Sequence, residues 1–285
     1  MNLLNNWQLW VFIYIASAVI FAQSFKKANK NMKDPAALTV LLELSTAGFS
    51  IIFIPLFPII VAHKSSIYIT LIIVTIIYAI TDRLNIEARY GLEPSTFSML
   101  KQLSTVFMLI FGFTILHEEL IIHKIIGAII ILIANFILTI EKGKIRFNKY
   151  FIMAIISNFL FAVAMLINVN ISDYFNLGIY TIITVTIPAI IISICSKQTI
   201  KKLKKEFNRY DKKSFLIAGL TWSIMLISSV RAYQLGNITV IAPLFALTSI
   251  INALVEYILY KNKNRFIQKL IAAILLIIGV ILIRI

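Results

Sequence analysis

Ten stretches of about twenty mostly apolar residues fill this chain of 285 residues, and short polar gaps separate them. A helix of roughly 20 apolar residues is long enough to cross the hydrocarbon layer of a membrane. Because lipid offers no partners to backbone N–H and C=O groups, we expect these stretches to be helices. The hydrophobic content of 60% and the charged content of 14% agree. The sequence therefore predicts an all-α integral membrane protein with ten transmembrane helices.

Short polar breaks, several of which contain proline or glycine, mark the ends of the predicted spans. Asp34-Pro35 precedes the second span, Glu93-Pro94 opens the fourth, and Gly236 closes the eighth. Pro243 lies inside the ninth span and predicts a kink there. The spans are 7–25, 36–62, 67–92, 94–116, 121–140, 150–171, 176–195, 215–236, 238–260 and 266–283.

The basic residues are distributed unevenly among the gaps. Of the 27 Lys and Arg residues, 20 lie in odd-numbered gaps, within residues 26–33, 142–149, 197–213 and 261–269. The even-numbered gaps and the tail hold three, which are Lys64, Lys124 and Arg284. The positive-inside rule therefore predicts a multi-pass protein of the cell (inner or plasma) membrane with both termini outside. The net charge of +15 then reflects orientation and contact with anionic lipid headgroups, not nucleic-acid binding.

Two segments of the chain resemble each other. Residues 91–132 align with residues 235–277, so that Leu103-Ser104-Thr105 meets Leu247-Thr248-Ser249. Each segment supplies the last two spans of a five-span half, and an odd number of spans gives the halves opposite orientations. We therefore expect a first repeat at 1–141, a basic cytoplasmic linker at 142–149 and a second repeat at 150–285. Inverted repeats are typical of transporters, with the substrate site at the repeat interface.

A short pattern recurs at the end of each segment. "LS" or "LT" lies in mid-helix, and ILHEE (115–119) or ILYKNK (258–263) follows. The pattern resembles the EamA-type transporters of the drug/metabolite transporter superfamily. The resemblance covers both halves and implies a ten-helix carrier of small metabolites that works by alternating access. Two features depart from it: Glu118 has no acidic counterpart near Asn262 and Lys263, and family members usually have cytoplasmic termini.

Ionisable groups within spans mark the candidate site, because each costs about 2.5–3.5 kcal/mol to insert. Asp82 lies about 15 Å before the joint between the third and fourth spans, and Lys101 about 10 Å after it. We expect a polar cluster of Asp82, Asn85, Lys101 and Ser104 that lines a cavity. The alternative is a structural ion pair that joins two helices, and the sequence favours neither.

Three further groups of candidates lie elsewhere in the spans. Glu43 is a candidate for a coupling proton, and its alternative role is pairing with a basic side chain of another helix. Arg231 is a candidate for binding a substrate carboxylate, with snorkelling or pairing as the alternative. Arg83 and Glu87 are four residues apart and are interpreted as a structural pair. The remaining substrate-binding candidates are Thr248, which aligns with Ser104, then Asn252 and Tyr14.

Catalytic and metal-binding motifs are weak. His117 and His123 flank Glu118 and Glu119, but a zinc-protease helix needs histidines four residues apart, not six. A single cysteine, Cys195, excludes an intramolecular disulfide and a multi-cysteine metal site. No Walker A motif or glycine-rich cofactor loop occurs in the sequence. We therefore expect neither an enzyme nor a cofactor or metal.

The sequence predicts a secondary transporter for a small polar organic metabolite, such as an amino acid or related zwitterion. Its partners would be that substrate and membrane lipid, and a homodimer is compatible with this arrangement. The alternatives are a non-transporting membrane scaffold or accessory subunit and, less favoured, an intramembrane enzyme acting on lipid-linked substrates. A hydrated central pocket would distinguish the carrier from the scaffold, in which the charges pair fully.

Overall fold

The computed structural model describes residues 3–92, 97, 100–119, 121–139, 148–260 and 266–284. Within these ranges the chain is all-α and contains no strand. Six helical segments are long and apolar enough to cross a membrane. They contain α1 (Trp7–Ala28), α2 (Pro35–Ser50), α3 (Ser65–Gly91), α7 (Lys149–Ile171), α8 (Leu177–Cys195) and α10 (Lys212–Leu235). The chain is therefore a multi-pass membrane protein.

The other helices are apolar or short. The apolar ones are α5 (Leu103–Thr114), α6 (Ile122–Thr139), α11 (Ile238–Tyr260) and α12 (Phe266–Arg284). The 3-10 helices are η1 (Leu3–Asn5), η2 (Ile51–Leu56) and η3 (Ser172–Tyr174). Helix α9 (Ile200–Phe207) lies in the predicted basic surface segment. Pro243 lies inside α11, as the sequence indicates.

The second span is the clearest difference from the prediction. The sequence predicts one helix over residues 36–62, but α2 ends at Ser50 and η2 replaces it as far as Leu56. Pro55 and Pro58 lack the N–H that an α-helix requires, so the helix cannot continue through them. In the fourth span, residues 93–96, 98 and 99 lie outside the described residues, and so does the predicted Glu93-Pro94 turn. Residues 142–147 of the predicted linker also lie outside them.

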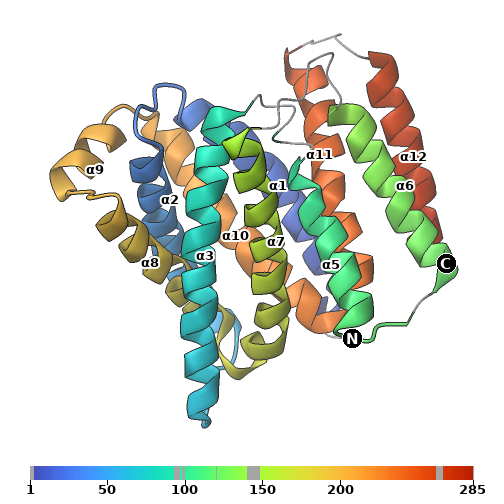
Figure 1. The fold of residues 1–285 in the computed structure, drawn as a ribbon, viewed down its shortest axis with the longest axis horizontal. Helices are drawn as coiled ribbons and strands as arrows, with labels where there is room; N and C mark the ends of the chain where they lie inside the picture. The colour runs from blue at the N-terminus through green and yellow to red at the C-terminus, as the bar shows by residue number, and fades with distance from the viewer. Residues whose placement is uncertain are drawn as a thin grey trace.

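The helices pack into one bundle (Figure 1). Helix α1 packs against α10, α3 against α7, α2 against α8, and α6 against α12. Both termini lie at the same end of the bundle in this view, and the turn between α1 and α2 lies at the opposite end. The short helix α9 extends from that second end. The predicted basic gaps described here, at the α1–α2 turn and at α9, therefore lie away from the termini.

A buried amide fixes η2 to α8. The Asn176 side chain, which is 1% exposed, donates to the carbonyl oxygens of Ile54 (3.0 Å), Phe57 (2.7 Å) and Pro58 (3.3 Å). Its Oδ1 accepts from the Ile179 N–H and so caps α8. The backbones also approach closely, because a Cβ on Gly178 would lie 2.8 Å from the Ile54 nitrogen. Asn176 thus satisfies carbonyl groups that the proline-broken segment leaves without helical partners.

We expect Asn176→Ala to lower the free energy of unfolding by about 1–3 kcal/mol, because it removes the side-chain donor to the Phe57 and Pro58 carbonyls and leaves the Ile54 carbonyl with a long bond of 3.4 Å from the Phe57 N–H. The thermal unfolding midpoint of the purified protein in detergent measures this effect. The matched control is Asn170→Ala, since the exposed Asn170 amide donates only within its own helix, to Leu166. Equal midpoints for the two variants would contradict the role assigned to Asn176.

Candidate functional site

Two carboxyl groups meet between α2 and α3. Glu43 lies eight residues after the start of α2 at Pro35, and Asp82 lies nine residues before the end of α3 at Gly91. At the rise of an α-helix both are roughly 12–14 Å from the same end of the bundle. The two carboxyl groups lie close enough to interact with each other. The pair therefore lies deep within the apolar part of the bundle.

This contact requires a proton. Two carboxylates held this close repel each other, so the contact is favourable only when one of them carries a proton. Glu43 is 7% exposed, and its Oε2 has no hydrogen-bond partner among the described residues. The Asp82 carboxyl is an ionisable neighbour of Glu43 that the sequence analysis did not expect, and the pairing of Glu43 with a basic side chain stays a prediction. Sequence reasoning missed this contact because no periodicity relates two residues on different helices.

A chain of polar side chains continues from Asp82 across three helices. One turn away on α3, Tyr78 shares a hydrogen bond with the amide of Asn168 on α7. Tyr180 on α8 donates its hydroxyl proton to Oδ1 of the same amide. Both Asn168 (3% exposed) and Tyr180 (1%) are buried. The sequence analysis did not select them, although an asparagine inside an apolar span was a usable signal.

The other three members of the expected Asp82 cluster lie on α3 and around the start of α5. The Lys101 side chain is exposed, just before α5 begins. Ser104 is buried, but its hydroxyl donates to the Lys101 carbonyl 2.8 Å away. Asn85 is half-buried on α3. The structure therefore leaves Asp82 deep in the bundle and brings Lys101 to its surface.

One expected pair is confirmed. The Arg83 guanidinium lies 2.5 Å from the Glu87 carboxylate, with 42% and 35% of the two side chains exposed. An ion pair this exposed contributes little to stability. Its importance is its position, because both residues line the cavity described below.

The second-half candidates lie in separate places. Thr248 is half-buried, and its buried hydroxyl has no partner among the described residues. The Asn252 Oδ1 accepts a long hydrogen bond of 3.4 Å from Gln23 of α1. Arg231 donates to Gln234 (3.0 Å) and to Asn5 (3.2 Å) near the N-terminus. Its guanidinium is therefore engaged by amides at the terminal end of the bundle.

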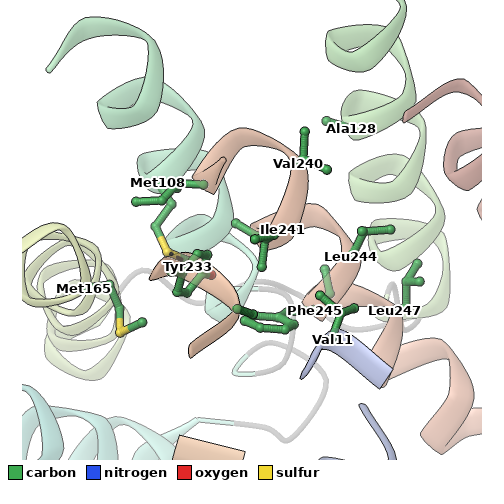
Figure 2. Packing of buried hydrophobic residues seen from close by; sticks show 14 of the residues in the cluster. Val11, Met108, Ala128, Met165, Tyr233, Val240, Ile241, Leu244, Phe245 and Leu247 are labelled. Atoms are coloured by element: carbon green, nitrogen blue, oxygen red, sulfur yellow. Dashed lines mark hydrogen bonds between the residues drawn. The ribbon is translucent and has the colours of Figure 1, made fainter. Parts of the chain in front are cut away.

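The middle of the bundle beside α10 and α11 is filled with apolar side chains. Tyr14 stacks on Phe245 with the ring centres 3.7 Å apart. Figure 2 shows Met108, Met165 and Tyr233 gathered where α5, α7 and α10 approach one another. The Tyr233 hydroxyl is 3.6 Å from the Met108 sulfur. This part of the centre is filled with apolar side chains, and Tyr14 contributes to its packing.

An open cavity of about 580 Å³ lies at the basic end of the bundle, near the α1–α2 turn and the segment from α8 to α9. The starts of α2 and α7, the last turns of α3, and the segment from α8 to α9 surround it. Its charged lining residues are Lys33, Asp34, Arg83, Glu87, Lys149 and Lys202. The nearest lining residue on α3, Arg83, follows Asp82 directly. Asp82 is therefore next in sequence to a residue that lines the cavity.

A buried glutamate holds one wall of this cavity. The Glu206 Oε1 accepts from the N–H groups of Lys33 (2.6 Å) and Asp34 (3.2 Å). Its other oxygen pairs with Arg209 at 2.5 Å. Glu206 is only 2% exposed. Helix α9 thereby fixes the α1–α2 turn in place.

A second glutamate caps α11 near the terminal end of the bundle. The Glu118 carboxylate accepts from the N–H of Ile238 (2.7 Å) and from the N–H of Thr239 (2.9 Å), at the start of α11. The Thr239 hydroxyl also donates to it. Negative charge at a helix N-terminus is favourable. Gly112 permits the close approach, because a Cβ there would lie 2.6 Å from the Thr239 methyl group.

No group of three or more His, Cys, Asp or Glu side chains within the described ranges could hold a metal ion. The expectation that the chain binds no metal or cofactor is not tested by this finding.

A search of known proteins gives a fold but no family. A solved structure entitled "Crystal structure of protein" has a TM-score of 0.77 to this chain. The alignment of the two covers 96% of this chain and 94% of the chain in that structure, at 12% sequence identity. No protein-family model and no curated protein matches the chain. At this identity the likeness shows a shared fold and nothing about activity.

Proposed function

We propose that the chain is a secondary transporter that moves a small polar organic metabolite by alternating access. The observation that carries the proposal is the Glu43–Asp82 pair within the bundle, together with an open, charged cavity whose lining includes Arg83, the residue after Asp82. Ionisable groups at this depth are costly, and in membrane proteins they mark proton relays and substrate paths. A carboxyl pair that shares a proton is suited to release it when the helices separate.

The helix pairings support ten spans in two related halves. If α1, α2, α3, α5 and α6 correspond to α7, α8, α10, α11 and α12, several helix contacts have a counterpart, although the α6–α11 contact has no α5–α12 counterpart among the contacts of the described residues. The α1–α10 contact corresponds to α7–α3, α2–α10 to α8–α3, and α1–α11 to α7–α5. The α2–α8 and α6–α12 pairs correspond to themselves. Such exchange is expected of the inverted repeats found in carriers.

The two ends of the bundle differ in a way that fits one state of a carrier. The cavity opens at the basic end, which the positive-inside rule assigns to the cytoplasm, while at the terminal end Glu118 links its own segment to the start of α11. We propose that the structure is the inward-open state, with both termini outside. An EamA-type identity, an amino-acid-like substrate and a homodimer remain parts of the same proposal.

A membrane scaffold is the second candidate, because the dry centre around Met108 and Tyr233 is what a scaffold predicts. The two candidates differ in their behaviour in closed vesicles. Purified full-length protein in proteoliposomes should take up amino acids or small organic acids faster with an imposed pH gradient than without one. Failure to transport any member of a broad metabolite panel, in either gradient direction, would favour the scaffold.

A further inference from the structure

The cavity at the basic end carries more positive charge than its fold requires. Its two acids already have partners: Glu87 pairs with Arg83, and Asp34 accepts from the N–H groups of Ala36 and Ala37. Asp34 also accepts from the Gln198 amide at 2.9 Å. The negative charges of the lining are therefore engaged within the protein.

Three ammonium groups in the lining have no such partner. No carboxylate of the described residues lies within ion-pair distance of Lys33, Lys149 or Lys202. The Lys202 ammonium donates to a backbone carbonyl at 3.1 Å, and the Lys149 ammonium lies 4.9 Å from the centre of the Tyr150 ring. Neither contact neutralises charge.

Helix ends add to the positive potential. Lys149 is the first residue of α7, whose cap is the neutral Asn148. A cation at a helix N-terminus is unfavourable, because the backbone N–H groups there already carry partial positive charge. This placement opposes stability unless an anion occupies the cavity.

Two buried polar atoms on lining residues also lack partners. The Ser196 Oγ and the Gln198 Oε1 have no hydrogen bond within the described part of the chain. The Gln198 oxygen can only accept, so it requires an N–H or O–H donor. The volume of about 580 Å³ lies in the range of small-molecule sites.

We infer that this cavity binds a small carboxylate-bearing molecule that also carries an N–H or O–H donor, as an acidic amino acid does. The carboxylate meets Lys33, Lys149 and Lys202, and the donor meets Gln198. That such molecules are also the transported substrates rests on the proposed function. Binding itself does not depend on transport.

The test measures binding of L-glutamate, succinate, neutral succinamide and inorganic phosphate to the detergent-purified full chain by calorimetry at low salt. We expect glutamate and succinate to bind at least about tenfold more tightly than succinamide, and salt to weaken them by screening. Each of Lys33→Met, Lys149→Met and Lys202→Met should weaken binding a few-fold, and the triple variant at least about tenfold. The matched control is Lys64→Met, an exposed lysine at the opposite end.

Several results would overturn the inference. The cavity would not be an anion site if succinamide bound as tightly as glutamate and succinate. The same would follow if the triple variant bound glutamate as tightly as Lys64→Met. Phosphate binding without carboxylate binding would assign the site to another anion. Loss of glutamate binding in nanodiscs of phosphatidylglycerol, but not of phosphatidylcholine, would assign it to lipid headgroups. Glutamate binding without any uptake by proteoliposomes would refute the transporter and leave the site intact.

Discussion

Glu43→Gln and Asp82→Asn should each reduce uptake driven by a pH gradient at least about tenfold, which corresponds to about 1.4 kcal/mol. An amide keeps the shape and the hydrogen bonding of the site but cannot release a proton. Exchange of labelled for unlabelled substrate without a gradient should change much less. The ratio of driven uptake to exchange in proteoliposomes measures this difference.

Asp173→Asn is the matched control for these variants, because Asp173 is exposed in η3. It should keep both activities. Monodisperse elution in size-exclusion chromatography shows that each variant is folded. A normal response to the pH gradient in both pair variants would exclude the Glu43–Asp82 pair as the coupling site. An equal loss of driven uptake and exchange would give the pair a structural role only.

Glu118→Ala should lower the free energy of unfolding by about 2–4 kcal/mol, since it removes the acceptor of three hydrogen bonds at the start of α11. Glu118→Gln keeps an oxygen acceptor but loses the charge, so we expect a smaller decrease. The measurement is the thermal unfolding midpoint in detergent.

The neighbouring glutamate provides the control for this prediction. Glu119 is exposed, and no hydrogen bond of its side chain is found within the described residues. Glu119→Ala should therefore leave the midpoint nearly unchanged. A similar decrease for Glu118→Ala and Glu119→Ala would show that the cap contributes nothing specific.

Much of the fold follows from hydropathy alone, because a bilayer imposes both the length and the helical form of each span. The predicted span 7–25 lies within α1 and 176–195 closely matches α8. The predicted second span is too long, because hydropathy counts Pro55 and Pro58 as part of an apolar stretch although they interrupt helical hydrogen bonding. Hydropathy records burial in lipid and not hydrogen bonding.

The site was less predictable than the fold. Local rules found the Arg83–Glu87 pair, since spacing along one helix determines it. The Glu43–Asp82 contact depends on how α2 and α3 pack, which one sequence does not specify. The Asp82–Lys101 cluster stays a prediction, which rests on opposite charges at similar depth. The Lys101 residue is exposed, so water can solvate its ammonium group.

The amide clamp of Asn176 has a mechanical consequence. Helix α2 runs directly into η2, and η2 is tied to α8, so these three segments are expected to move as one rigid body. Helix α3 is tied to α7 by the Ser157 hydroxyl, which donates to the Thr81 carbonyl. Glu43 and Asp82 therefore lie on opposite sides of a seam. Widening that seam by a few ångströms would separate the two carboxyl groups and would also break the Tyr180–Asn168 hydrogen bond, which crosses the seam from α8 to α7.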